Sequence, residues 1–354
     1  MQGIDHTPAP APAPPRRRWW KIVLLAAAGL LLIVIIAAAW LLVALKRPVG
    51  QGPAQVVVVE QGAAFGQVAR DLEARGLIRS ARALSLAARA NGAGGRIRFG
   101  EYRLSPQMSA LEMLDWLARG KVLLHKVTIP EGFTISRIAD VLGRNGLADS
   151  RAFRTAALNG GQQLRVPFRV PTSSLEGYLF PDTYYLERYR SADDLVRRML
   201  VRFYERVWLK MRTPRAADVQ HLSVHQVVTL ASLVEGEARR PQERGLIAGV
   251  LMNRLRVGQR LECDATVLYA MGYHKSRLTF ADLKVESPYN TYLHAGLPPG
   301  PINNPGAAAI EAALHPQASP FFYYVARPDG SHIFSRTLSE HLAAIARLKR
   351  AGLR

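Results

Sequence analysis

The stretch "SVHQVVTLASLVEGEARR", residues 223–240, predicts a helix that carries a carboxylate among apolar side chains. Ser223, followed three positions later by Gln226, has the pattern of an N-terminal capping box. At about 100° per residue, the apolar side chains form one broad arc: Val224, Val227, Val228, Leu230, Ala231 and Val234. Glu235 falls inside this arc, whereas Glu237 falls on the opposite, polar side. A carboxylate among apolar groups is costly unless it is paired, protonated or used, so Glu235 requires an explanation.

The N-terminal part of the chain contains an apolar run without a charged residue, from Ile22 to Leu45. About 20 such residues are enough to cross a bilayer. The run is also longer than the apolar core of a cleaved secretory signal. We therefore expect residues 22–45 to form a single uncleaved transmembrane helix rather than a buried core helix.

The charges that flank this span predict its orientation. Basic residues are more numerous before it than after it: Arg16, Arg17, Arg18 and Lys21 against Lys46 and Arg47. The more basic flank stays in the cytoplasm. We expect residues 1–21, which include a run of alternating Ala and Pro, to be a disordered cytoplasmic tail. The rest of the chain should then lie in the periplasm, on the outer side of the inner membrane.

The formal net charge of the 354 residues is +20, yet the basic residues are spread along the whole chain. An extracytoplasmic location excludes nucleic acid as a partner and favours anionic lipid or an anionic wall polymer. A single cysteine, Cys263, rules out an intramolecular disulfide bond. We expect it to be a small buried thiol.

A repeated segment predicts how the region after the span is organised. "GAAFGQVARDLEARGLI" (62–78) matches "GFTISRIADVLGRNGLA" (132–148), and each copy follows a β-rich run, residues 55–61 and 125–131. Each copy predicts a strand, a glycine turn and a short helix, and we expect both to pack on one sheet. We assign residues 50–126 to a small α+β domain, either a spacer or a glycan-binding module that resembles LysM domains. Residues 127–354 form the second, α+β domain.

The residues around Glu235 do not favour a zinc site or a serine nucleophile. His221 and His225 are four residues apart, but Leu222 stands where a zinc protease has glutamate. No G-x-S-x-G motif for a serine nucleophile occurs. Ser232 lies beside Glu235 on the helix, and we expect it to orient or solvate that carboxyl group.

Cleavage of a glycosidic bond remains, because an apolar environment keeps a general acid protonated. Hydrolysis usually needs a second carboxylate. The chain offers five candidates near these motifs: Glu176, Glu237, Glu243, Glu262 and Asp264. The residues alone leave open that Glu235 is a structural carboxylate paired with Arg239 or Arg254.

Several long motifs together resemble the endolytic murein transglycosylase (YceG-like) family. They occur in the family's order: "LEGYLFPDTYYL", "TLASLVEGEA", "ERGLIAGVLMNRLRVGQRLECDATVLYAMG", "ESPYNTYLHAGLPPGPINNPG" and "AALHPQASPFFYYVARPDGSHIFS". The resemblance covers nearly all of the chain beyond residue 50. It implies a membrane-anchored lytic transglycosylase that cleaves the MurNAc–GlcNAc bond within nascent peptidoglycan strands and leaves 1,6-anhydro ends.

The resemblance also implies roles for particular residues. Glu235 is the catalytic residue, acting as acid and then as base, so that no second carboxylate is needed. The substrate-binding set, with Ser232 added, is Glu176, Tyr178, Ser232, Asn253, Asp264, Thr266, Tyr289, Asn290 and Pro299. The family implies no metal or organic cofactor, and peptidoglycan synthases as possible partners. The alternatives are a non-catalytic peptidoglycan-binding scaffold and a hydrolase of the same bond.

Overall fold

The computed structural model describes residues 19–352, except residues 165, 213–218 and 274. Most of the predicted cytoplasmic tail, residues 1–18, therefore lies outside the described residues. The contacts within the chain divide it into two compact units, and the boundary in the sequence falls between Leu123 and Leu124. The first unit combines helices with one two-stranded antiparallel sheet and the second combines helices with two such sheets, which confirms the predicted α+β class.

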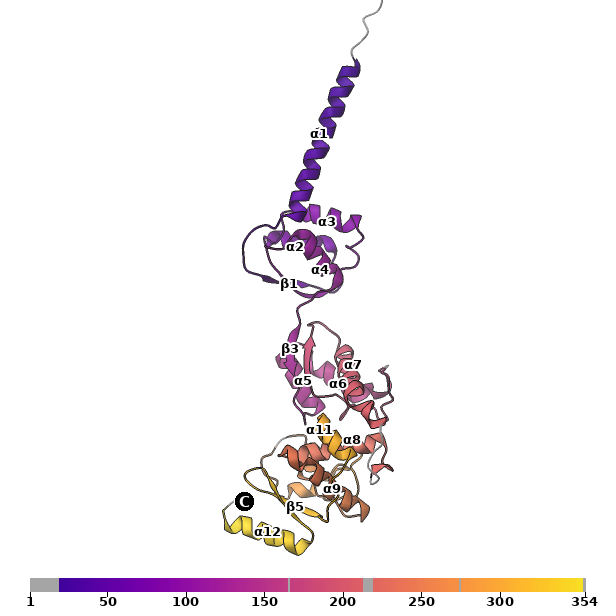
Figure 1. The fold of residues 1–354 in the computed structure, drawn as a ribbon, viewed down its shortest axis with the longest axis vertical. Helices are drawn as coiled ribbons and strands as arrows, with labels where there is room; N and C mark the ends of the chain where they lie inside the picture. The colour runs from indigo at the N-terminus through magenta and orange to yellow at the C-terminus, as the bar shows by residue number, and fades with distance from the viewer. Residues whose placement is uncertain (1–18, 165, 213–218, 274, 353–354) are drawn as a thin grey trace, which may run out of the picture. The chain divides into compact units, whose positions relative to one another are not determined.

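The predicted span forms helix α1, Trp19–Lys46 (Figure 1). Among the residues that the structure describes, it is the one helix long and apolar enough to cross a membrane. Its large apolar side chains are exposed along most of its length. Ala44 and Leu45, near its end, are instead buried in the core of the first unit. These features fit a single-pass membrane anchor.

The first unit beyond α1 is a two-stranded sheet covered by three short helices. Its elements are β1 (Gln55–Val59), α2 (Phe65–Ala74), α3 (Ala81–Ala90), β2 (Gly100–Leu104) and α4 (Ala110–Arg119). β1 and β2 are antiparallel, with Val57 opposite Tyr102, and both side chains are fully buried. The resemblance of this unit to a LysM domain stays a prediction.

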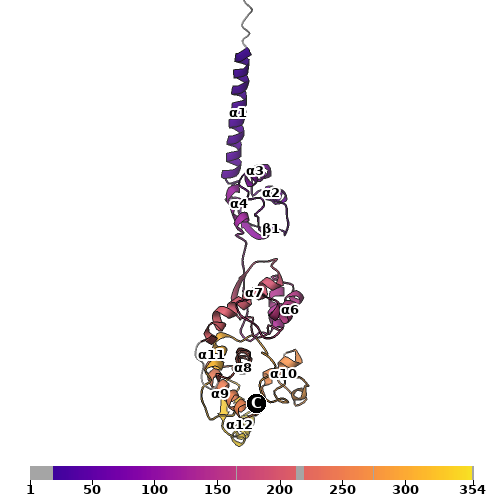
Figure 2. The same cartoon turned by 90° about the vertical axis from the view of Figure 1, so that its right-hand side faces the viewer.

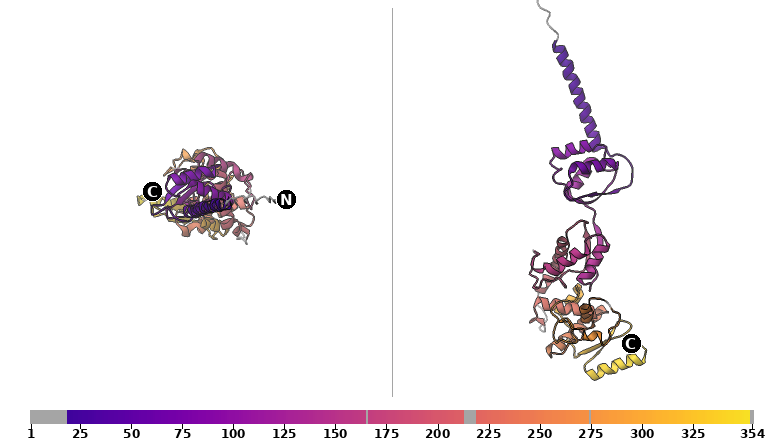
Figure 3. Two further views of the ribbon diagram at one scale, coloured as in Figure 1. Left: turned by 90° about the horizontal axis from the view of Figure 1, so that it is seen from above. Right: turned by 180° about the vertical axis from the view of Figure 1, so that it is seen from behind.

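The second unit is larger and mostly helical. Its first half contains β3 (His125–Thr128), α5 (Ile135–Arg144), α6 (Ser150–Asn159), the 3₁₀ turn Gly160–Gln162, β4 (Thr183–Leu186), α7 (Ala192–Phe203), the π-helical turn Tyr204–Trp208 and the 3₁₀ turn Lys210–Arg212. Its second half contains α8 (Val224–Glu237), the 3₁₀ turn Pro241–Glu243, α9 (Arg244–Arg256), α10 (Asp264–Met271), the 3₁₀ turn Asp282–Lys284, α11 (Ala307–Leu314), β5 (Tyr323–Ala326), β6 (His332–Ser335) and α12 (Leu338–Arg350). The β5–β6 hairpin packs against α12, the yellow helix at the right of Figure 3.

The repeat forms the predicted strand, turn and helix in both copies. The first copy is β1, Gly62 and α2, and the second is β3, Gly132 and α5. Both turn glycines have a positive φ, +80° and +74°, which favours glycine. The expectation that both copies pack on one sheet is wrong. β1 pairs with β2 and β3 pairs with β4, in different units, because each strand has an antiparallel partner within its own unit.

Helix α8 begins as predicted, with the capping box between Ser223 and Gln226. The expectation of one apolar and one polar face is wrong, because every residue from 227 to 234 is buried. α9, α10 and α11 all pack against α8, and Figure 2 shows them arranged around it. A helix covered on several sides has no solvent-facing stripe, so polar side chains on it need partners inside the protein.

Candidate active site

The carboxyl group of Glu235 lies where α8 ends, close to the starts of α9 and α11. Its side chain is 7% exposed. Arg244, the first residue of α9, places Nη2 3.3 Å from Glu235 Oε1. The backbone N–H of Gly306, which precedes α11, donates to Oε2 at 3.0 Å. An ion pair and a helix N-terminus therefore face the same carboxylate.

The expectation that Arg239 or Arg254 pairs with Glu235 is wrong, because the partner is Arg244. Arg254 lies in the last turn of α9, where its guanidinium donates to the backbone carbonyls of Arg260 and Leu261. Arg239 follows the end of α8 and is exposed. An ion pair to Glu235 is thus present, but it comes from the beginning of α9.

A second carboxylate, that of Glu131, lies beside the same arginine. It was not predicted as a site residue from the sequence. Glu131 Oε2 is 3.5 Å from Arg244 Nη2, the nitrogen that also contacts Glu235. At the next residue, Gly132, a side-chain carbon would lie 3.5 Å from Glu235 Cγ, so the turn passes close to this carboxylate. Burial raises the pKa of Glu131, and the charge of Glu235 raises it further, whereas Arg244 lowers it. The repeat carried a signal, because the first copy has Gln61 at the position of Glu131.

Asn304 holds three separate segments together beside this pair. Its Oδ1 accepts hydrogen bonds from the backbone N–H groups of Gly177 and Leu179, at 3.0 and 2.9 Å. Its Nδ2 donates to Glu176 Oε1 and to the backbone carbonyl of Phe133, both at 2.8 Å. The loop before α11, the turn after β3 and the "LEGYLFP" loop are thereby fixed relative to one another.

Glu176, from the predicted binding set, is 5% exposed and acts within this junction. Its two oxygens accept from the backbone N–H of Ile135, at 3.0 and 3.2 Å, at the start of α5. Burial raises the pKa of Glu176 to about 8, although hydrogen bonds from Ile135 and Asn304 oppose the shift. The carboxyl group is therefore mostly neutral near pH 7, and it supports the turn that carries Glu131.

Three more residues of the predicted set connect α8 to the loop before α11. Tyr178 is fully buried, and its hydroxyl group lies 2.9 Å from His225 Nδ1. The other ring nitrogen of His225 lies 3.1 Å from the carbonyl oxygen of Pro299. Ser232 donates from Oγ to the backbone carbonyl of Thr229 and accepts from the backbone N–H of Ile302, at 2.7 and 3.0 Å. Ser232 therefore orients this loop rather than the Glu235 carboxyl group.

Tyr289, Asn290 and Thr266 lie around the loop that follows the 3₁₀ turn at 282–284. The rings of Tyr289 and Tyr269 pack with centroids 4.9 Å apart. Asn290 is fully buried, and its Nδ2 donates to the backbone carbonyls of residues 283 and 285. Thr266 Oγ1 lies 3.0 Å from Thr291 Oγ1. These contacts fix the loop, and Tyr289 is the member of this group that is only partly buried.

Asn253 and Asp264 are the remaining residues of the predicted set, and each forms hydrogen bonds with another segment of the chain. Asn253 Nδ2 donates to the backbone carbonyls of Ser319 and Phe321, both at 2.8 Å. Asp264 begins α10 and accepts a hydrogen bond of 2.7 Å from the hydroxyl group of Tyr292. Direct contact of any residue of the predicted set with substrate stays a prediction.

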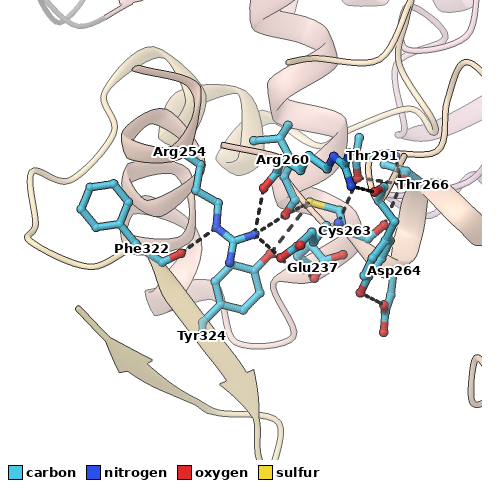
Figure 4. A network of polar contacts seen from close by, with 12 residues as sticks. Glu237, Arg254, Arg260, Cys263, Asp264, Thr266, Thr291, Phe322 and Tyr324 are labelled. Atoms are coloured by element: carbon cyan, nitrogen blue, oxygen red, sulfur yellow. Dashed lines mark hydrogen bonds and ion pairs between the residues drawn. The ribbon is translucent and has the colours of Figure 1, made fainter. Parts of the chain in front are cut away.

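Glu237 is not on a polar face, and that expectation is wrong. Its carboxylate accepts from the backbone N–H of Ala265 at 3.3 Å and from the hydroxyl group of Tyr324 at 3.2 Å (Figure 4). Burial raises its pKa to about 7, with a further contribution from Asp264. Cys263 is buried in the same network, as predicted for a structural thiol. Glu237 is only partly exposed, because α10 and the hairpin cover the end of α8.

Each of the five second carboxylates suggested by the sequence is bound elsewhere. Their partners are Ile135 and Asn304 for Glu176, Tyr324 for Glu237, His332 for Glu243, Arg254 for Glu262 and Tyr292 for Asp264. Among the described carboxylates, Glu131 is the one that shares a cation with Glu235. The site therefore consists of Glu235, Glu131, Arg244 and the backbone N–H of Gly306.

Comparison with known proteins places the chain in a family. The sequence profile of the YceG-like family matches residues 57–347. The chain is 33% identical over 301 residues to the endolytic murein transglycosylase of Bacillus subtilis (strain 168), an alignment that covers 80% of this chain and 81% of that protein. It is 29% identical over 315 residues to the endolytic murein transglycosylase of Streptococcus pneumoniae (strain ATCC BAA-255 / R6), covering 80% of this chain and 56% of that protein.

A crystal structure of a yceG-like protein from Listeria monocytogenes is similar in fold. The TM-score is 0.54 at 32% sequence identity, and the alignment covers 83% of this chain and 100% of that chain. The profile and the Bacillus relative each span most of this chain. The chain therefore belongs to the YceG-like family, as its motifs predicted.

Proposed function

We propose that the chain is an endolytic lytic transglycosylase of peptidoglycan, with Glu235 as its catalytic residue. The observation that carries the proposal is the place of this carboxyl group. It is nearly buried, and it lies against a cation and a backbone N–H at the end of the central helix. The substrate class comes from the relatives, which are named endolytic murein transglycosylases.

The reaction needs one group that acts first as an acid and then as a base. Glu235 donates its proton to the glycosidic oxygen between N-acetylmuramic acid and N-acetylglucosamine, and the C1–O bond breaks. The C6 hydroxyl group of the muramic residue then attacks C1, and its proton returns to Glu235. The product is a 1,6-anhydro end, and no water is consumed. An intramolecular nucleophile makes this step efficient without a positioned water.

Arg244 and Gly306 can stabilise Glu235 at the stage of the reaction when it is ionised. When Glu235 has given up its proton, the guanidinium and the backbone N–H stabilise the carboxylate that remains. Both groups are in place before the reaction, since each starts or precedes a helix packed on α8. Little rearrangement is then required when the charge develops.

The helix α1 suggests where the enzyme works. We propose that it spans the inner membrane with its N-terminus in the cytoplasm, so that both units lie in the periplasm, where nascent glycan strands emerge. Cleavage there would terminate strand elongation beside peptidoglycan synthases. The basic flank before the span supports this orientation.

A hydrolase of the same bond is the second candidate, and Glu131 is the observation in its favour. Hydrolysis by two carboxylates needs one acid and one nucleophile or base, and Glu131 lies beside Glu235 at the shared arginine. Glu131 is also the more exposed of the two side chains, at 47%. The products separate the candidates, because hydrolysis adds one water to each cleaved bond.

The test compares Glu235→Gln with the wild type and with a matched control. Glu311→Gln is the control, because it makes the same change in charge on the surface of α11, where the Glu311 side chain is 63% exposed. Each full-length protein is incubated with purified peptidoglycan, and the new ends are identified by mass. We expect 1,6-anhydro ends from the wild type and the control, and a rate at least ~10²-fold lower from Glu235→Gln.

Two results would contradict the proposal. Full activity in a folded Glu235→Gln protein would remove the catalytic assignment. Binding of peptidoglycan without any cleavage by the wild type would favour a scaffold protein.

A further inference from the structure

The end of α1 is built into the first unit and is not joined to it by a linker. Ala44 and Leu45 are buried in the core of this unit. Helices α3 and α4 both contact α1. Nη2 of Arg79, just before α3, donates to the backbone carbonyls of Pro48 and Val49, at 2.9 and 3.2 Å. The first unit is therefore fixed against the last turns of α1.

The length of α1 indicates where this junction lies relative to a bilayer. The helix has 28 residues and is therefore about 42 Å long. The hydrocarbon core of a bilayer is about 30 Å thick, which takes about 20 residues. With Trp19 and Trp20 at one interface, the part in hydrocarbon runs from Ile22 to about Leu41. The last turn of α1, which enters the core of the first unit, then emerges at the level of the outer headgroups.

Helix α3 carries a stripe of Arg82, Leu86 and Arg89, called the α3 stripe below. These residues are four and three positions apart, so they lie on one side of the helix. The opposite side is buried in the core of the unit: Ala81, Ala83, Leu84 and Ala88. Leu86 is 56% exposed, and α3 contains no acidic residue. Neither arginine of the stripe forms an ion pair with a residue that the structure describes.

The position of α3 turns this stripe toward the bilayer. α3 packs against α2 and α4 with its buried side, and it also contacts α1. Figure 1 shows α3 across the end of α1, at the side of the unit from which α1 leaves. Arg79 ties the start of α3 to the chain just beyond α1. The side of α3 that faces away from the core therefore faces the membrane surface.

We propose that the α3 stripe docks on the phosphate headgroups of anionic lipid in the outer leaflet. The inference rests on the part of the proposed function in which α1 spans the membrane, and it is independent of the catalytic residue. A guanidinium group binds phosphate oxygens through paired hydrogen bonds. An exposed leucine between two arginines suits the boundary between headgroups and acyl chains. Docking holds the first unit in one orientation at the membrane surface.

The first test measures how close α3 comes to lipid. Leu86→Cys in the full-length protein is labelled with a fluorophore, in vesicles of phosphatidylglycerol and phosphatidylcholine that carry a quencher just below the headgroups. The native Cys263 is buried, so the label attaches to the introduced cysteine. Val58→Cys is the control, because Val58 is also an exposed apolar residue, 41% exposed, on β1. Figures 1 and 2 show β1 at the far side of the unit from α1. We expect lipid to quench the Leu86 label and not the Val58 label.

The second test removes one charge from the stripe. Arg89→Gln is added to the labelled Leu86→Cys protein, and Arg103→Gln is the control, because it makes the same change in charge at an exposed position of β2. Loss of one arginine beside anionic lipid should lower the ratio of docked to undocked protein about fivefold, read from the quenched fraction. Arg103→Gln should leave this ratio unchanged. Vesicles of phosphatidylcholine alone, or salt at about 1 M, should weaken the quenching as Arg89→Gln does.

Several outcomes would overturn the inference. An unquenched Leu86 label in a protein whose α1 spans the vesicle would do so, even if that protein cleaves peptidoglycan. Equal quenching of the Leu86 and Val58 labels, or no effect of Arg89→Gln, would also contradict docking by the stripe. Protection of the Leu86 label by added peptidoglycan but not by lipid would assign the stripe to the glycan instead. A lipid-quenched Leu86 label in a protein that cleaves nothing would uphold the inference and contradict the proposed function.

Discussion

Replacing Glu176 by glutamine should make the second unit less sensitive to alkaline pH. Glu176 is 5% exposed and has a pKa of about 8, against an ordinary value of 4.5. Its folded form is therefore mostly neutral at pH 7, and glutamine has nearly the same size and a neutral oxygen acceptor. The amide oxygen can still accept from Ile135 and Asn304.

The size of this pH effect follows from the number of protons that the folded and the unfolded chain bind. The folded-state pKa is raised, so the stabilisation is complete below about pH 4.5 and is lost as the pH rises through about 8. Between these values the folded chain holds up to one more proton than the unfolded chain. Each pH unit then lowers the free energy of unfolding by up to ~1.4 kcal/mol. Glutamine binds no proton, so Glu176→Gln lacks this slope.

The assay is urea unfolding of the full-length protein in detergent micelles, from about pH 5 to about pH 8. The stability of Glu176→Gln relative to the wild type should rise steadily over this range. Contributions from other carboxyl groups are common to both proteins and cancel. Glu176→Ala is a useful comparison, because it leaves the N–H groups of Ile135 and Asn304 without their acceptor and should cost ~1–3 kcal/mol for each group. Parallel stability curves for the wild type and Glu176→Gln would refute a neutral buried carboxyl group.

Two further substitutions test the surroundings of the site. Gly306→Ala should displace the carboxyl group of Glu131 and lower the rate of peptidoglycan cleavage, with a loss of stability of ~1 kcal/mol, and it should add little to Glu131→Gln in the double variant. Glu237→Gln should keep most of the cleavage activity, measured on the same peptidoglycan. Its unfolding free energy relative to the wild type should rise between about pH 5 and about pH 7, because burial raises the pKa of Glu237 to about 7 and glutamine lacks this titration.

Features encoded by neighbouring residues could be predicted from the sequence. The capping box of Ser223 and Gln226, the apolar span and the glycine turns at Gly62 and Gly132 all formed where their patterns placed them. Each of these signals depends on residues only a few positions apart. The family was recognised for a different reason, since several long motifs in a fixed order leave few alternatives.

The partners of these elements could not be predicted in the same way. β1 and β3 each precede one copy of the repeat, but their pairing with β2 and β4 depends on contacts with distant parts of the chain. The assignment of Glu237 to a polar face failed for a related reason. Periodicity gives the azimuth of a side chain on a helix, but it does not reveal how many sides the rest of the protein covers.

The candidate site shows the same division between local and distant information. Glu235 stood out because its own helix is apolar, and this required no knowledge of other segments. Glu131 and Arg244 reach it from elsewhere, and Glu131 is more than a hundred residues away in the chain. The one sequence signal for Glu131 is that the first copy of the repeat has Gln61 at the equivalent position. A difference between repeats at a turn can therefore mark a residue recruited to a site.

The central claim is that an intramolecular hydroxyl group, and not water, attacks the cleaved bond. Cleavage of purified peptidoglycan in ¹⁸O-labelled water, followed by mass measurement of the new muramic ends, tests it most directly. We predict ends that lack ¹⁸O and are lighter than hydrolytic ends by one water. New ends that carry one ¹⁸O atom would contradict the account and identify the enzyme as a hydrolase.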